Sequence, residues 1–271
     1  MIDSGTPSLW RRAWPPALAG LVGVASLPLV ILPTLEALMG AGRSPTHSLA
    51  LLAVLSLIQP TLLVIVAAFI GAALAPGLGF TSYLAGVNAR GPFVKQIRRA
   101  LAAGLVVGVV IVALDIALFR HFTLHPIGSV PLRGIVQALV GGMLYGGLSE
   151  EVMMRWGLMT LVVWLGVRLA GRRTAIAASR SGVGASGVAI PAPLYAIAIV
   201  LVALVFAAGH LPAAGAIAPL TADVVLRILL LNAVAGFVFG WLYWKASLEA
   251  AMLAHATVHV VFAIAQYLGW G

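Results

Sequence analysis

Residues 48–75 read SLALLAVLSLIQPTLLVIVAAFIGAALA and contain no charged side chain. A helix of about 20 mostly apolar residues is long enough to cross the hydrocarbon core of a bilayer. Five more apolar segments of this kind occur along the chain, at residues 15–39, 100–119, 191–211, 223–244 and 248–268. The sequence therefore predicts an all-α, polytopic membrane protein built as a bundle of seven or eight transmembrane helices.

The composition of the whole chain agrees with a membrane protein. Of its 271 residues, 62% are hydrophobic and 8% are charged, and the mean hydropathy is +1.11. A soluble domain carries about 25% charged residues, so a chain with this few charges cannot cover a water-facing surface. The absence of cysteine from the sequence excludes disulfides and thiolate metal sites.

The net charge of +9 comes from Lys and Arg residues that lie between the apolar segments. Such residues set the topology of a membrane protein and contact anionic lipid headgroups, whereas a nucleic-acid-binding protein gathers them in a patch. We therefore expect a lipid bilayer and no nucleic acid among the partners. Arg11 and Arg12 precede the first apolar run without a cleavage site, which indicates a first membrane helix and not a signal peptide.

The number of spans depends on residues 133–170, where Ser149, Glu150 and Glu151 interrupt two apolar runs. Two short spans would give eight helices, whereas one long, kinked or broken element would give seven. With a cytoplasmic N-terminus, seven spans place eleven Lys and Arg inside and three outside, and eight spans place six inside and eight outside. The positive-inside rule favours seven spans, or a re-entrant element after the glutamates.

The chain is expected to form one integrated membrane domain. Residues 1–130 supply about three N-terminal helices, and residues 131–271 carry the polar motifs described below. Residues 75–92 and 171–187 are rich in small and polar residues, so we expect a connector and a flexible polar loop there. Small residues let helices approach closely in lipid. G-x-x-x-G pairs that predict packing within the monomer occur at Gly104/Gly108, Gly142/Gly146 and Gly236/Gly240.

Ionisable side chains inside membrane spans are candidates for function, because each costs roughly 2.5 to 3.5 kcal/mol to insert. Three motifs hold most of them: Glu150-Glu151-x-x-x-Arg155, Phe206-x-x-x-His210 and His255-x-x-x-His259. On a helix Glu151 and Arg155 are i,i+4 neighbours and can pair. Glu150 is rotated about 100° from Glu151 and can face a cavity.

Each motif also has a structural interpretation. The glutamates can mark a solvated helix end, and His210 can lie at the membrane interface. His255 and His259 share one helix face, where they can bind a metal, donate hydrogen bonds to a ligand, or bond to neighbouring helices. Other charged residues are interpreted as structural: Asp223/Arg227 and Lys245/Glu249 as i,i+4 pairs, and Asp115 as a partner of a neighbouring helix or of water.

The three motifs in this order resemble those of the CAAX protease and bacteriocin-processing (CPBP) family, whose best-known members are the type II CAAX prenyl endopeptidases. The family pattern is E-E-x-x-x-R, then F-x-x-x-H, then H-x-x-x-N or H-x-x-x-D. The resemblance covers residues from about 133 to 268. This chain has His259 where the family usually has Asn or Asp.

The resemblance implies peptide-bond hydrolysis inside the membrane. Glu150 would be the general base, His210 would position the water, and His255 and His259 would stabilise the oxyanion. Arg155 would orient Glu151 and balance its charge. Whether a metal takes part stays open, with zinc as the candidate ion and Glu150, His210, His255 and His259 as its candidate ligands.

The resemblance makes a membrane-associated protein or peptide the expected substrate, and the Ala- and Gly-rich chain suggests a bacterial plasma membrane with a cytoplasmic N-terminus. Two alternatives remain at this point. A scaffold or immunity protein of the same family could have lost catalysis, as the change at His259 suggests. A proton- or metal-coupled transporter also uses intramembrane Glu and His, although no internal repeat of the transporter kind is found.

Overall fold

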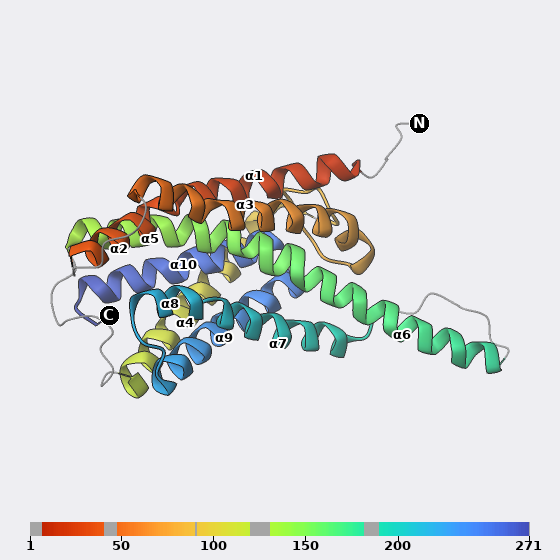
Figure 1. Cartoon of the computed structure of the whole chain (residues 1–271). Coiled ribbons are helices and arrows are strands. Elements are labelled where there is room, and N and C mark those ends of the chain that lie inside the picture. Colours follow the sequence, from red (N-terminus) through yellow and green to blue (C-terminus); the bar gives the residue numbers. More distant parts are fainter. Residues whose placement is uncertain (1–6, 41–47, 90, 120–130, 182–189, 271) are drawn as a thin grey trace.

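The computed structural model describes residues 7–40, 48–89, 91–119, 131–181 and 190–270, and these ranges form helices without any β-strand (Figure 1). The α-helices are α1 (Leu9–Ser26), α2 (Pro28–Gly40), α3 (Leu49–Leu74), α4 (Val94–Phe119), α5 (Leu132–Gly141), α6 (Thr160–Ser181), α7 (Ala192–Gly209), α8 (Leu211–Ile217), α9 (Ala222–Lys245) and α10 (Leu248–Tyr267). A 3₁₀ turn, η1 (Ala75–Leu78), follows α3. Two π-helical stretches, η2 (Gly142–Glu150) and η3 (Val152–Met159), join α5 to α6.

Seven helical segments of the described chain are long and apolar enough to cross a membrane, which confirms the polytopic all-α prediction. The outer surface of the bundle is apolar as well. Val54, Val106 and Leu204, for example, are 59%, 64% and 52% exposed. Water would penalise a surface of this kind, whereas lipid accepts it.

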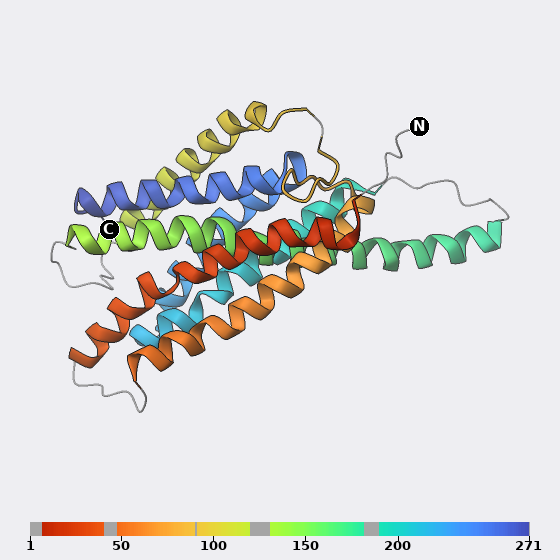
Figure 2. The ribbon, with the colours of Figure 1, turned by 90° about the horizontal axis from the view of Figure 1, so that it is seen from above.

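The fourth span, Leu132–Gly171, is one element of 40 residues and contains the Glu150-Glu151 pair. The seven-span layout is therefore the observed one. Forty residues reach at most about 60 Å at 1.5 Å per residue, twice the thickness of the hydrocarbon core. Accordingly α6 extends well beyond its neighbours at one end of the bundle (Figures 1 and 2).

The prediction of a polar loop at 171–187 is wrong for the first part of that segment, because α6 continues to Ser181. Residues 172–181 hold three alanines and no glycine or proline, so local helix propensity outweighs their polar composition. The remainder of that segment, 182–187, lies outside the described residues.

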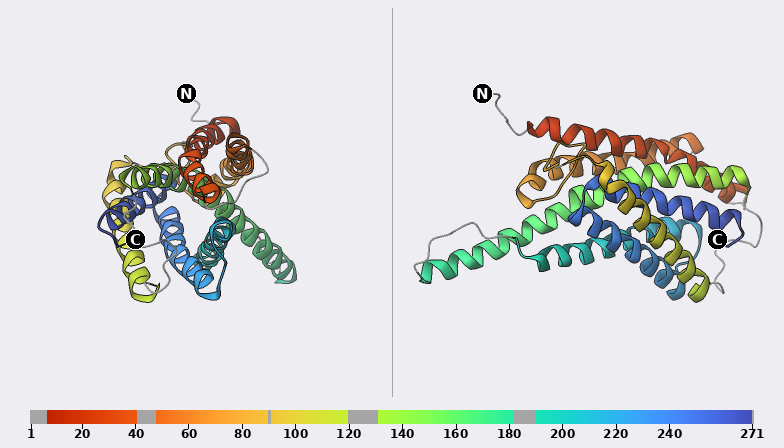
Figure 3. Two further views of the ribbon diagram at one scale, coloured as in Figure 1. Left: turned by 60° about the vertical axis from the view of Figure 1, so that its left-hand side comes forward. Right: turned by 180° about the vertical axis from the view of Figure 1, so that it is seen from behind.

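The long fourth element lies at the centre of the bundle (Figure 3). Its π-helical stretches contact α1 and α3 on one side and α10 and α7 on the other. The pairs α4–α10 and α7–α9 complete the packing. The middle of the central element is therefore buried, with Val152, Arg155, Trp156 and Met159 each 0% exposed.

The three G-x-x-x-G pairs pack within the chain, as predicted. A methyl group at Gly108 would lie 2.9 Å from Val261 Cβ on α10, and one at Gly236 would lie 2.9 Å from Ala203 Cα on α7. Gly142 and Gly146 of η2 instead face the rings of His255 and His259. This last pair thus makes room for side chains of the candidate site.

The structure corrects both i,i+4 ion pairs predicted near helix ends. Arg227 donates from Nε to one oxygen of Asp115 at 2.5 Å and from Nη2 to the other at 2.6 Å, so it joins α9 to α4 and does not pair with Asp223. A bidentate bond of this kind is stronger than a single exposed helix pair. The interpretation of Asp115 as the partner of a neighbouring helix is confirmed.

Lys245 and Glu249 lie on different helices, because α9 ends at Lys245 and α10 begins at Leu248. The Lys245 ammonium lies 3.4 Å from the centre of the Trp244 ring. Glu249 accepts hydrogen bonds from the Ser82 hydroxyl at 2.7 Å and from the Leu84 amide at 3.1 Å. Glu249 therefore fixes the connector after α3 to the start of α10.

Candidate active site

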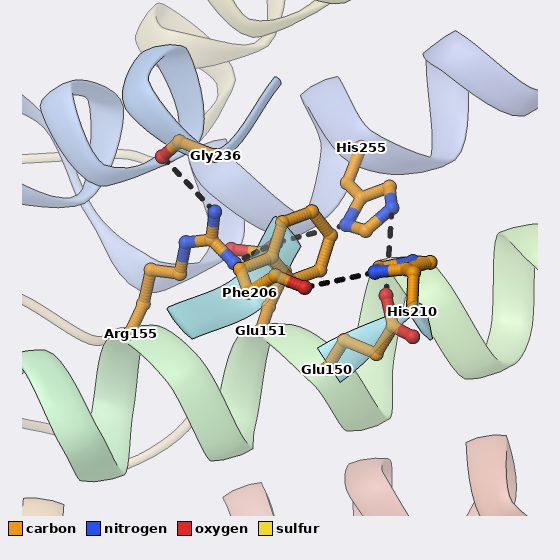
Figure 4. A network of polar contacts seen from close by, with 7 residues as sticks. All are labelled: Glu150, Glu151, Arg155, Phe206, His210, Gly236 and His255. Atoms are coloured by element: carbon orange, nitrogen blue, oxygen red, sulfur yellow. Dashed lines mark hydrogen bonds and ion pairs between the residues drawn. The ribbon is translucent and has the colours of Figure 1, made fainter. Parts of the chain in front are cut away.

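The Glu150-Glu151 pair lies at the junction of the two π-helical stretches, η2 and η3. A π-helix widens the turn by bonding residue i to residue i+5, and such segments often occur at functional sites. Thr160 follows this wider spacing, since its hydroxyl donates to the carbonyl of Arg155, five residues earlier, at 3.2 Å. The two adjacent glutamates point into different surroundings (Figure 4).

Glu151 points into the protein and forms a buried ion pair with Arg155. The two side chains are 0% exposed, and Arg155 Nη1 lies 3.1 Å from Glu151 Oε1. The predicted i,i+4 pair is therefore confirmed. Arg155 also donates from Nη2 to the Gly236 carbonyl at 3.1 Å, and its guanidinium lies 4.9 Å and 5.4 Å from the centres of the Phe206 and Phe239 rings.

This setting makes the pair costly to break. Glu151 Oε2 and Arg155 Nε are buried and make no hydrogen bond to any residue that the structure describes. The two aromatic faces compensate part of that loss through cation–π attraction. Removing one partner would leave the other charge buried and uncompensated.

His255 of α10 is oriented by Glu151. Its Nδ1 lies 2.8 Å from Glu151 Oε1, and its ring stacks on Phe239 with the centroids 4.5 Å apart. An ionised carboxylate only accepts hydrogen bonds, so Nδ1 of the neutral imidazole carries the proton and Nε2 carries the lone pair. The Nε2 atom lies 3.9 Å from Glu150 Oε2.

His210 is held in the corresponding tautomer by the backbone. It lies at the break between α7 and α8, where Pro212 follows and removes a backbone donor. The His210 amide bonds to Ala207 O, which leaves the Phe206 carbonyl to accept from His210 Nδ1 at 2.8 Å. A carbonyl cannot donate, so the proton is on Nδ1 and Nε2 is bare.

Although α7 ends at Gly209, the apolar span continues through α8 to Ile217. His210 thus lies within the apolar span and not at its end. His210 also lines the cavity between the helices, which favours a role in the site over an interfacial one. The helix break places its ring inside the bundle.

Glu150 faces a cavity of about 470 Å³ between the helices, and its side chain is 17% exposed. His210, His255 and His259 line the same cavity, whereas Glu151 and Arg155 do not. His259 stacks on His255 with centroids 5.3 Å apart and meets Phe262 edge-on. The structure therefore brings all six predicted site residues into one cluster, with four at the cavity wall and two behind it.

Several cavity residues were missed by the sequence reasoning. Tyr145 and Asn232 line the wall, and the Asp115–Arg227 pair contributes charged groups to it. Most of the remaining wall is apolar. Tyr145 lies five residues before Glu150, but that spacing matters only on a π-helix, and nothing in the sequence signals one.

The candidate metal ligands do not fit an ion. Among the residues that the structure describes, no group of three or more His, Asp or Glu side chains is arranged to hold one. The zinc alternative is therefore not supported, and no metal enters the mechanism proposed below.

Comparison with known proteins identifies a protein family that shares this part of the chain. Residues 131–261, which are 131 of the 271 residues, match the family model described as type II CAAX prenyl endopeptidase Rce1-like. No match was found among curated proteins or among solved structures. The matched range contains all three polar motifs, and with them the Glu150, His210, His255 and His259 side chains of the cavity wall. The resemblance inferred from those motifs is thus confirmed: residues 131–261 of this membrane protein match an Rce1-like domain of the CAAX protease family.

Proposed function

We propose that the protein is an intramembrane endopeptidase that hydrolyses a peptide bond of a membrane-associated protein or peptide, with Glu150 as the general base. The observation that carries the proposal is that three proton acceptors line the same cavity. The Glu150 carboxylate and the bare Nε2 atoms of His210 and His255 line one cavity inside the bundle. A water molecule held there would have its protons directed at acceptors and its oxygen lone pairs free.

In this mechanism Glu150 removes a proton from the water while the oxygen adds to the substrate carbonyl. The second proton of the water is directed at the bare Nε2 of His210 or of His255, which accepts a hydrogen bond from it. The protonated Glu150 then passes its proton to the leaving amine, so that one water is consumed for each bond cleaved. General acid–base assistance of this kind contributes about 10²- to 10⁴-fold to a rate.

This scheme changes the role first assigned to His255. With its proton on Nδ1 and bonded to Glu151, neutral His255 cannot donate from Nε2 to an oxyanion. Its proposed role is to hold the water, with Glu151 and Arg155 behind it fixing the ring. His259, whose ring lies beside His255 at the cavity wall, remains a candidate donor to the oxyanion.

The cavity also supports a substrate class. Its wall is mainly apolar, and 470 Å³ accommodates a short peptide segment. The family name points to prenylated C-terminal sequences, and unprenylated membrane peptides are the second class to test. Neither the scaffold nor the transporter alternative is favoured by the family match.

The test is cleavage by purified protein in liposomes, followed by mass spectrometry. The substrates are prenylated C-terminal peptides and unprenylated transmembrane peptides, each incubated with and without EDTA. We expect cleavage of at least one class, no effect of EDTA, and a loss of at least 100-fold in Glu150→Gln. Full activity in Glu150→Gln would overturn the role of Glu150, and loss of activity with EDTA would restore the metal alternative. No cleavage of any substrate would count against the peptidase.

A further inference from the structure

The site as described has several acceptors for the water but few donors for the oxyanion, with His259 as the candidate named so far. Hydrolysis passes through a tetrahedral intermediate whose oxygen carries negative charge, and enzymes stabilise it with preorganised donors. Glu150, His210 and His255 present only acceptor atoms to the cavity, on the tautomers derived above. The Asn232 amide uses one of its two N–H groups on the Ile228 carbonyl at 2.8 Å, and Arg227 forms an ion pair with Asp115. An oxyanion is stabilised by several preorganised donors, so a neutral donor beside His259 would complete the site.

Tyr145 has the required chemistry and position. It lines the cavity together with Glu150, and the two residues lie five apart in the same π-helical stretch. Bonding from residue i to residue i+5 brings residues of that spacing onto one side of a π-helix. The phenol therefore faces the same space as the Glu150 carboxylate.

The hydroxyl of Tyr145 differs from those of the other buried tyrosines. It makes no hydrogen bond to the residues that the structure describes, although it is half-buried inside a span. A buried tyrosine hydroxyl usually finds a partner. The other tyrosines with hydrogen-bonded hydroxyls are Tyr83 with Gln96 at 3.0 Å, Tyr195 with Leu78 O at 2.7 Å, and Tyr243 with Thr160 at 2.8 Å.

We propose that Tyr145 is a further catalytic residue, whose phenolic O–H donates a hydrogen bond to the oxyanion of the tetrahedral intermediate. The inference rests on the proposed peptidase function and adds a specific donor to it. Tyrosine suits this task because it is neutral, so the bond forms without a second charge in the membrane. No covalent bond to Tyr145 is made, and its proton stays on the phenol throughout.

The first experiment compares Tyr145→Phe with Tyr267→Phe, a control at a tyrosine that is 72% exposed. Loss of one oxyanion donor lowers kcat by about 10²- to 10³-fold, and we expect this loss in Tyr145→Phe with KM nearly unchanged. Tyr267→Phe should behave as wild type. Unchanged kcat in Tyr145→Phe would overturn the proposal.

The second experiment needs no turnover. Binding of a peptide and of its phosphonate analogue, a stable mimic of the tetrahedral anion, is measured by calorimetry in Glu150→Gln and in Glu150→Gln/Tyr145→Phe. We expect the Tyr145 change to weaken phosphonate binding at least tenfold and to leave peptide binding within twofold. Equal weakening of both ligands, or of neither, would overturn the proposal.

The two measurements separate the two ideas. If wild-type protein cleaves nothing but binds the phosphonate through the Tyr145 hydroxyl, the donor role stands and the peptidase proposal fails. If cleavage occurs and Tyr145→Phe changes neither kcat nor phosphonate binding, the peptidase proposal stands and the donor role fails.

Discussion

His255 and Glu151 are joined by a 2.8 Å hydrogen bond between Nδ1 of the imidazole and Oε1 of the carboxylate. The bond connects α10 to the central element of the bundle, and both side chains are buried. It sets the tautomer of His255 and leaves the bare Nε2 toward Glu150. One carboxylate of the Glu-Glu pair thus orients a histidine, while the other remains free for chemistry.

The first prediction separates the two glutamates. Glu150→Gln and Glu151→Gln should both lower activity at least 100-fold, the first by removing the base and the second by releasing His255. Only Glu151→Gln should lower the melting temperature clearly, because Glu151 is fully buried against Arg155 whereas Glu150 faces the cavity. Thermal unfolding in detergent measures the difference, and equal destabilisation by the two changes would contradict this division of roles.

The second prediction concerns the buried ion pair. Arg155→Met should reduce the free energy of unfolding by about 3 to 5 kcal/mol, because it leaves Glu151 charged and unpaired. The double variant Glu151→Gln/Arg155→Met should recover part of that loss. Arg168→Met serves as the control, since Arg168 is exposed and stacks on Trp164; its effect should stay below about 1 kcal/mol. A double variant less stable than Arg155→Met would refute the argument.

The third prediction concerns Gly146, whose missing side chain leaves space for the rings of His255 and His259. A methyl group at Gly146 would lie 2.7 Å from His259 Nε2 and 2.9 Å from His255 Nε2, so both rings must move. A displacement of about 1 Å at a catalytic group can cost about 100-fold in rate. Gly146→Ala should therefore lose activity to that extent while remaining folded. Gly171→Ala, which meets no atom within 4 Å, should keep full activity.

The fourth prediction concerns the topology, and the absence of cysteine from the chain makes it easy to test. Seven spans place Pro7 and Gly171 on one side of the membrane and Pro219 on the other. Single cysteines at these positions should label accordingly with an impermeant maleimide applied to oriented vesicles. The positive-inside rule predicts that Pro7 and Gly171 are cytoplasmic. Labelling of Pro7 and Gly171 from opposite sides would contradict the single long fourth span.

The sequence alone determined the class of the protein and the six motif residues of the site. Long uncharged runs such as residues 48–75 are stable as helices inside a bilayer. A helix pairs its own backbone N–H and C=O groups there, where no water is present to do so. Charged groups in such runs are costly enough to indicate function. Glu150, His210 and His255 could therefore be selected before any tertiary structure was known.

The arrangement within the site was decided only by tertiary structure. The π-helical turns around Glu150 depend on how the central element packs against α1, α3 and α10, and local propensity does not encode that packing. The pairing of Arg227 with Asp115, 112 residues away, has the same origin. Histidine tautomers follow from hydrogen-bond partners such as Glu151 and the Phe206 carbonyl, which reach the rings only in the folded bundle. Composition determines which groups lie in the membrane, and packing determines which atoms they present to one another.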